Sequence, residues 1–188
     1  MQKMKFRFLL AFVIAAMALT IPSISQQQES NKIGQIVISG NQNINTDTIQ
    51  NVITSKVGDE YDQAKIDADV AAIKNIGYFT GVVAQRQIEP GGLKIIFEVI
   101  EHPRIASIEI TGNDPIPADK IIAAIRSKPG SVLNENTLRQ DVDTIQSLYA
   151  DEGYFAYITG EPTVDEKGVM TIPILVNKVG KVIISGNR

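Results

Sequence analysis

The side chains that could carry out catalysis or bind a metal ion are few and scattered in this sequence of 188 residues. It has no cysteine, and its single histidine, His102, lies next to Pro103. A histidine-based catalytic relay and a multi-histidine metal site therefore lack the residues that they need. Without cysteine the chain can form no disulfide, and the lack of cysteine is compatible with both the cytosol and the periplasm. We interpret His102 as a linker residue and expect no cofactor.

Carboxylates form the only clusters that suggest a cation site or an acid–base pair. The stretch "DEYD" occupies 59–62, and Asp67 and Asp69 follow it. Their order does not match a calcium-binding loop. Negative charge is favourable at the start of a helix. We therefore expect a solvent-facing, helix-capping surface here, and polar helix faces at "DADV" (67–70) and "QDVD" (140–143).

The amino-terminal residues have the pattern of an export signal. Three basic residues precede the apolar run "FLLAFVIAAMALTI" (8–21), and small residues follow it. This order predicts a secretory signal peptide at 1–25 and a polar linker at 26–32. A retained membrane anchor is the alternative, although the run is shorter than the about 20 residues that a spanning helix needs.

The remainder of the chain is acidic. Without the three basic residues of the signal, 15 Lys and Arg face 21 Asp and Glu, a net charge of −6. There is no basic block. An exported acidic body of this kind argues against a nucleic-acid partner.

A repeat organises everything after the linker. "IVISGN" (36–41) recurs as "IEITGN" (108–113) and "VIISGN" (182–187), and the glycines of successive copies are 72 and 74 positions apart. The offset of 72 also aligns the apolar positions inside the first two copies. It then becomes 76 and brings "GYF" at 77–79 onto "GYF" at 153–155. The four extra residues amount to about one helical turn, so we expect one helix to be longer in the second copy.

Each copy predicts the order strand, helix, helix, strand, strand. Gly40 and Gly112 end the first strand as turn residues, because neither lies in a glycine-rich phosphate loop. Thr46 or Asp47 is expected to cap the first helix. The second helix opens at Asp62, and its counterpart in the second copy opens at Asn134. Gly77 and Gly153 then end these helices in a left-handed conformation, before a hairpin of two strands.

In that hairpin, Leu93, Ile95, Phe97 and Val99 should face the core, and Lys94 and Glu98 the solvent. The fold class is therefore α+β, with tandem βααββ units in which two helices pack on a three-stranded sheet. The units span 33–102 and 104–177, and 178–188 is the first strand of an incomplete third. The short join "EHPR" predicts semi-rigid neighbours. The "GYF" aromatics are expected to anchor the core, with surface contacts as the alternative.

The joint order of "ISGN", "GYF" and "FEVIE", repeated at matched offsets, resembles the polypeptide-transport-associated (POTRA) domain. This is the domain of outer-membrane assembly proteins typified by BamA and TamA, of the surface antigen type, and of two-partner secretion transporters. The resemblance covers 33–188. Its structural anchors are Gly40, Asn41, Gly77, Tyr78, Phe79, Gly112, Asn113, Gly153, Tyr154 and Phe155.

The resemblance implies a mixed sheet with the third strand in the middle and the second at an edge. It also implies binding of unfolded outer-membrane proteins and of periplasmic or lipoprotein accessory subunits, ahead of a carboxy-terminal β-barrel. An extended peptide would bind by adding a strand at an edge. The candidate edge residues are Val82, Val83, Ala84, Gln85, Arg86, Gln87, Ile88, Ala156, Tyr157, Ile158 and Thr159.

The second copy departs from the family pattern in its last strand, "VMTIPILVNK". The offset of 76 places Pro173 on Phe97 and Asn177 on Glu101. Proline in a central strand removes a ladder hydrogen bond, so we expect a bulge or a shortened strand there.

Three functions compete. The leading prediction is a periplasmic, non-enzymatic, chaperone-like binding module associated with the outer membrane. The second is a scaffold of the cell-division type, held at the inner membrane by the apolar run. The third, a hydrolase or transferase, lacks a convergent set of catalytic groups.

Overall fold

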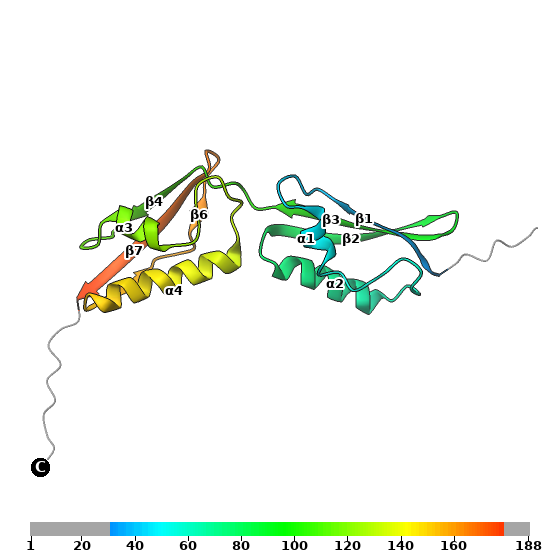
Figure 1. The fold of residues 1–188 in the computed structure, drawn as a ribbon, viewed down its shortest axis with the longest axis horizontal. Coiled ribbons are helices and arrows are strands. Elements are labelled where there is room, and N and C mark those ends of the chain that lie inside the picture. The colour runs from blue at the N-terminus through cyan, green and yellow to red at the C-terminus, as the bar shows by residue number, and fades with distance from the viewer. Residues whose placement is uncertain (1–30, 179–188) are drawn as a thin grey trace, which may run out of the picture.

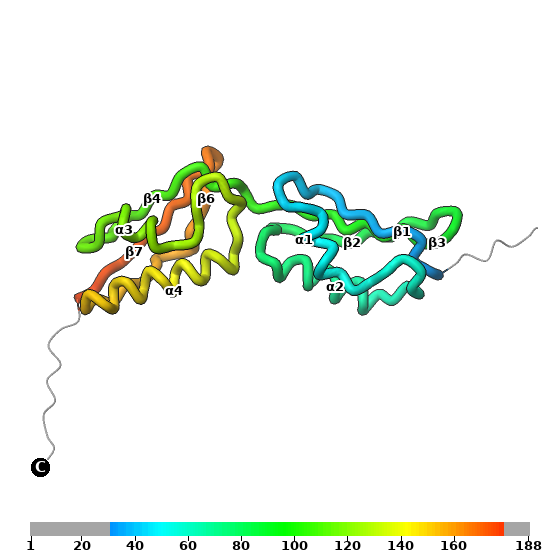
Figure 2. The backbone as a smooth tube through the Cα atoms, in the orientation of Figure 1, coloured from blue at the N-terminus to red at the C-terminus, as the bar shows by residue number. Residues whose placement is uncertain are grey.

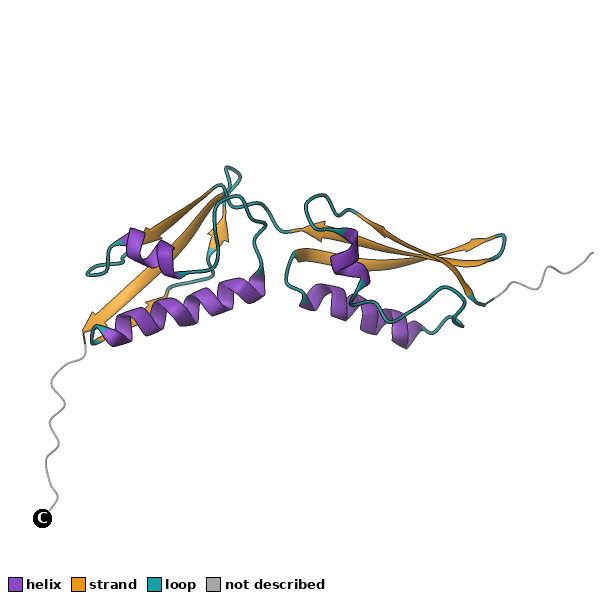
Figure 3. Ribbon diagram, viewed as in Figure 1, coloured by secondary structure: helices purple, strands orange, loops and turns teal. Residues whose placement is uncertain are grey.

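The structure is a computed structural model that describes residues 31–178, in which two units follow one another (Figure 1). The predicted α+β class, with two helices on a three-stranded mixed sheet, is confirmed. Figure 3 shows how helices and strands form separate layers in each unit. The elements are β1 (Ile33–Ser39), α1 (Thr46–Gln50), α2 (Gln63–Asn75), β2 (Phe79–Glu89), β3 (Gly92–Glu101), β4 (Ser107–Thr111), α3 (Ala118–Ala124), α4 (Glu135–Asp151), β5 (Tyr154–Ile158), β6 (Thr163–Val164) and β7 (Val169–Lys178).

The sheet of the first unit has the strand order β1-β3-β2. β3 pairs with β1 in parallel and with β2 antiparallel, so it is the central strand and β2 lies at an edge. The predicted inward face of β3 is confirmed, because these side chains are at most 6% exposed: Leu93, Ile95, Phe97 and Val99. They pack against Ile49 of α1 and against Ile66 and Ile73 of α2, so both helices cover one face of the sheet.

The sheet of the second unit has the order β4-β7-β5, and the short β6 also pairs with β7. Ser39 lies opposite Glu98 in the first unit, and Thr111 lies opposite Pro173 in the second. Because Thr111 is the repeat equivalent of Ser39, Pro173 corresponds to Glu98 and not to Phe97. The offset of 76 is therefore wrong by one residue in this strand, where the two hairpins differ in length.

Pro173 does not shorten its own strand, contrary to the prediction. β7 is continuous, whereas the edge strand beside it is interrupted between β5 and β6. The Pro173 carbonyl accepts a hydrogen bond from Thr159 N at 2.9 Å. The backbone of residue 173 therefore faces the edge strand, and β5 ends where proline offers no N–H. Thr159, predicted as an edge-strand residue, lies just beyond the end of β5.

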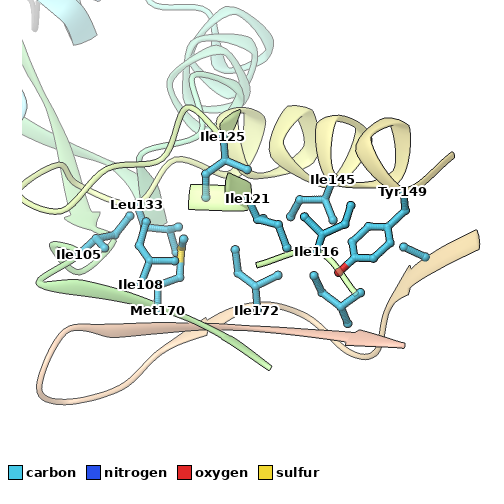
Figure 4. Packing of buried hydrophobic residues seen from close by; sticks show 12 residues of the cluster. Ile105, Ile108, Ile116, Ile121, Ile125, Leu133, Ile145, Tyr149, Met170 and Ile172 are labelled. Carbon is cyan, nitrogen blue, oxygen red and sulfur yellow. The ribbon is translucent and has the colours of Figure 1, made fainter. Parts of the chain in front are cut away.

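The four-residue insertion lengthens a helix, as predicted. α2 has 13 residues and α4 has 17. Tyr149 lies on the added turn, is fully buried, and donates a hydrogen bond from its hydroxyl to the Asn113 carbonyl. Figure 4 shows Tyr149 beside Ile145 and Ile116 in the core of the second unit. Burial raises the pKa of Tyr149, and Asp114 adds to the effect.

The helix caps correct one prediction and confirm two. Asn45, and neither Thr46 nor Asp47, caps α1 by accepting from Asp47 N at 2.9 Å. Asp62 and Asn134 cap α2 and α4 as predicted. Asn45 has the short acceptor side chain that suits this position, one residue earlier than expected.

A single connector, 102–106, joins the two units (Figure 2). His102 lies in it, and its Nε2 is 3.2 Å from Glu135 Oε1. At the far end, β7 extends to Lys178, the residue at which a third unit was predicted to begin. The remaining residues of that predicted strand, and the predicted signal peptide, lie outside the described residues.

Candidate functional site

The described residues offer no obvious catalytic or metal centre. Between residues 31 and 178, no group of three or more His, Cys, Asp or Glu side chains is arranged to hold a metal ion. No helix in this range is long and apolar enough to cross a membrane. The candidate site is the edge strand that the resemblance predicts in each sheet, β2 and β5, while β1 and β4 form the opposite edges.

The hydrogen-bond pattern identifies which residues of β2 face the open edge. Leu93 N donates to Lys32 O at 2.8 Å, so Leu93 and every second residue after it face β1. The alternate residues of β3 face β2, and their partners in β2 face back toward β3. The open backbone groups of β2 therefore belong to the remaining residues: Val82, Ala84, Arg86 and Ile88. Val83, Gln85 and Gln87 direct their backbone groups into the sheet.

The same reasoning applies to β5. Thr159 N donates to Pro173 O, so Phe155 and Tyr157 also turn their backbone groups toward β7. The open backbone groups of β5 belong to Tyr154, Ala156 and Ile158. β5 is thus a shorter open edge than β2, with 5 residues against 11.

The second unit exposes aromatic side chains next to its edge. Phe155 is 56% exposed and Tyr157 is 52% exposed, and Leu175 lies opposite Tyr157 with 52% exposure. The prediction that the "GYF" aromatics anchor the core is therefore right for Phe79, which is 1% exposed, and wrong for Phe155. β2 has a register irregularity between Phe79 and Gly81. This irregularity changes the face of the sheet to which Phe79 points, so that Phe79 is buried where Phe155 is exposed.

A groove of about 440 Å³ lies between the β5 edge and α4. From α4 it is lined by Asp143, Gln146, Ser147 and Ala150, and from the edge by residues 154–157. A strand added to β5 would therefore lie beside this groove, and its successive side chains would alternate between the two faces of the sheet.

The β2 edge is more polar. Arg86 lies over the Tyr61 ring, 4.9 Å from its centroid, and Gln85 donates to Glu98 at 2.9 Å. Val83 and Ile88 are 53% and 63% exposed. Charged and polar side chains of this kind limit non-specific pairing at an edge.

The "ISGN" and "ITGN" glycines make the end of the first strand fit against the central strand. Gly40 has φ +89° and Gly112 has φ +68°, both in the left-handed region. A Cβ atom would lie 2.1 Å from Val99 O at Gly40 and 2.1 Å from Ile174 O at Gly112. Both positions therefore require glycine for conformation and for space.

Two aspartates that were expected on solvated helix faces are buried. Asp69 is 1% exposed, and its carboxylate accepts from Thr54 N, Thr54 Oγ1 and Ser55 N at 2.8–3.1 Å. Burial alone would raise the pKa of Asp69, but hydrogen bonds from Ser55 and Thr54 outweigh it and hold the pKa below its ordinary value.

Asp141 repeats this arrangement in the second unit. It is 0% exposed and accepts from Arg126 N at 2.6 Å and Ser127 N at 3.0 Å. Both aspartates thus bind the backbone that follows the first helix of their unit. The prediction of a solvent-facing surface is wrong for these two positions, because their backbone donors lie too far along the chain to be recognised as local caps.

Glu101 has a structural role that the sequence pattern did not reveal. Its carboxylate accepts from the backbone N–H groups of Gln42, Asn43 and Ile44 at 2.7–3.1 Å. Burial opposes ionisation, yet the hydrogen bonds from Ile44, Asn43 and Gln42 lower the pKa of Glu101. Glu101 therefore fixes the loop that follows the "ISGN" motif.

Comparison with known proteins decides the family. The POTRA model, described as "Surface antigen variable number repeat", matches residues 31–102 and 103–184. The chain belongs to the POTRA family. The two matches correspond to the two units, and this confirms the resemblance inferred from the repeated motifs.

Relatives of this POTRA chain include outer-membrane assembly factors. It is 35% identical over 130 residues to the outer membrane protein assembly factor BamA of Nitratidesulfovibrio vulgaris. That alignment covers 69% of this chain and 16% of the relative. BamA of Neisseria meningitidis serogroup B is 28% identical over 124 residues, covering 64% of this chain and 15% of the relative. The chain thus spans about one sixth of the length of these relatives.

Solved POTRA structures have the same fold. The N-terminal domain of Omp85 from Thermosynechococcus elongatus superposes with a TM-score of 0.70 and 26% identity, covering 76% of this chain and 61% of that one. POTRA domains 1–3 of Omp85 from Anabaena give a TM-score of 0.63 at 25% identity, covering 76% and 60%. Each match covers more than one unit of this chain.

Proposed function

We propose that this chain is the periplasmic, non-enzymatic POTRA region of an outer-membrane protein assembly factor. In this role it binds extended segments of unfolded outer-membrane proteins or of accessory proteins. The observation that carries the proposal is the pair of open edges, β2 and β5, in a chain of the POTRA family whose relatives include BamA proteins.

Strand addition suits a partner that has not yet folded. The open N–H and C=O groups of an edge pair with main chain, so many sequences can bind. Side chains then select among them. At β5 the exposed face of Phe155, Tyr157 and Leu175 favours apolar residues at every second position of the added strand.

A pair of proline variants tests strand addition at β2. Ala84 turns its N–H to the open edge, so Ala84→Pro removes an edge donor without breaking a ladder bond. Val83 turns its N–H to β3, so Val83→Pro breaks the sheet instead. We expect Ala84→Pro to keep an unfolding midpoint near that of the parent and to lose binding at β2, whereas Val83→Pro lowers the midpoint.

Binding is measured by NMR titration of the labelled chain with a peptide of about ten residues that alternates apolar and polar side chains, as in barrel strands. Ala156→Pro is the matching variant at β5. Unchanged peptide affinity in a folded Ala84→Pro, Ala156→Pro double variant would rule out binding at these edges.

A scaffold anchored in the inner membrane is the second candidate, favoured by the apolar run at 8–21. Protein sequencing of the mature chain distinguishes the two. An amino terminus near Gln26 supports the assembly factor, and a retained Met1 in an inner-membrane fraction supports the scaffold.

A further inference from the structure

The start of α4 meets the end of α2, and the two helices lie end to end (Figure 1). The carbonyl groups of one helix therefore face the N–H groups of the next, which is a favourable alignment of helix dipoles. Three hydrogen bonds cross this contact: Asn134 Nδ2 to Ile76 O at 2.8 Å, Glu135 N to Gly77 O at 2.9 Å, and Asn136 Nδ2 to Asn75 O at 2.8 Å.

Asn134 acts in both units at once. Its Oδ1 caps α4 by accepting from Asn136 N at 2.9 Å and Thr137 N at 3.0 Å. Its Nδ2 meanwhile binds the preceding unit. At the equivalent position of the first unit, Asp62 caps α2 but has no side-chain donor. The asparagine thus adds a contact that an aspartate cap could not make.

Gly77 leaves the space that this contact needs. A Cβ atom at Gly77 would lie 2.9 Å from Asn136 Nδ2 and 3.0 Å from Asn134 Oδ1. The equivalent Gly153 has nearly the same φ, +80° against +85°, but a Cβ atom there would meet nothing within 4 Å. The two glycines therefore have the same backbone conformation, but only Gly77 packs against residues of another unit.

The connector between the units is also held along its length. Its backbone hydrogen bonds are His102 N to Tyr78 O, Leu133 N to Pro103 O, Ile105 N to Ser131 O and Ala106 N to Gly168 O, at 2.7–3.0 Å. Arg104 donates to Gly130 O and, at 3.4 Å, to Asn43 Oδ1. The connector thus binds the body of both units.

We propose that Asn134 and Asn136 lock the two units into one rigid body, so that the β2 and β5 edges keep a fixed relative orientation. Polar interfaces between domains ordinarily permit relative motion. Here the hydrogen bonds between the ends of α2 and α4, together with the anchored connector, prevent relative motion of the two units. The superposition of more than one unit on Omp85 supports a shared arrangement.

Distances between two spin labels test the proposal in the full chain. The sequence has no cysteine, so Val57→Cys and Lys167→Cys provide one exposed label in each unit. We expect a single narrow distance distribution in the parent. Asn134→Asp with Asn136→Asp keeps acceptors at the helix start but removes both crossing side-chain donors, and should at least double the width of the distribution.

Two controls isolate the joint. Asp62→Asn makes the reverse change, from aspartate to asparagine, at the cap of α2. This cap lies away from the joint, so the width of the distance distribution should not change. Gly77→Ala places a methyl group against Asn134 and Asn136 without changing any residue of α4, and should broaden the distribution. Gly153→Ala has equal backbone strain but no such neighbour, and should leave the distribution narrow. A broad distribution in the parent overturns the proposal. So does an unchanged width in both Gly77→Ala and the double asparagine variant.

Discussion

At the scale of single residues, the repeat preserves side chains that bind backbone. Asp69 and Asp141 are separated by the repeat offset of 72, and each binds the two N–H groups that follow the first helix of its unit. Buried carboxylates are costly without such donors. These two buried aspartates therefore stabilise the fold through their hydrogen bonds to the backbone.

Asp69→Asn is expected to destabilise the first unit by about 1–3 kcal/mol at neutral pH, because an amide group then faces backbone donors. The folded pKa of Asp69 is lowered, so its stabilisation is present above the ordinary value of 3.8 and is lost as pH falls through the folded pKa. The variant should show a weaker loss of stability in that acidic window. Urea unfolding as a function of pH measures this.

Asp67→Asn is the control for this experiment, because Asp67 lies on the same helix and is exposed. It should change neither the unfolding free energy at neutral pH nor its acid dependence. Equal effects of the two variants would contradict a special role for Asp69.

Gly40→Ala separates close packing from backbone strain when it is compared with Gly58→Ala. Both glycines have positive φ, +89° and +97°, so both variants should lose about 1–2 kcal/mol from the left-handed conformation. Only Gly40 lies against Val99 O, and overpacking there should cost about 1–3 kcal/mol more. Thermal unfolding of the two variants measures the difference. Equal melting temperatures would show that the contact with the central strand adds nothing.

At the scale of elements, the sequence predicts helices better than edges. The apolar stripe and the four-residue insertion correctly give the longer α4, because helical period and insertion length are local properties. The partner of Pro173 and the face of Phe155 could not be predicted in this way. Both depend on strand register and on irregularities such as that between Phe79 and Gly81, which are set by pairing between strands.

The added turn of α4 gives a prediction at this scale. Tyr149→Phe keeps the buried ring but leaves the Asn113 carbonyl without its donor, so the second unit should lose about 1 kcal/mol. Tyr154→Phe is the control, since the Tyr154 hydroxyl makes no hydrogen bond with the described part of the chain. Chemical denaturation measures both variants. If they are equally stable, the hydrogen bond to the "ITGN" turn does not contribute.

At the scale of the whole molecule, two cores share one chain. One buried cluster lies in the first unit and the other in the second, and the two have no residue in common. The helix-to-helix joint between them is polar. The sequence predicted the two units and a short join, but not the role of Asn134, because asparagine and aspartate cap helices equally well.

Because the cores are separate, a core mutation should destabilise one unit and spare the other. Ile73 and Ile145 are repeat equivalents, and both are 0% exposed. Ile73→Ala should cost the first unit about 2–5 kcal/mol, and Ile145→Ala should do the same to the second. Hydrogen exchange followed by mass spectrometry should show lost protection in α2 and β3 for Ile73→Ala, with α4 and β7 still protected. The pattern should reverse for Ile145→Ala. Loss of protection in both units in either variant would mean that the polar joint couples their unfolding, and the two cores would then form a single cooperative body.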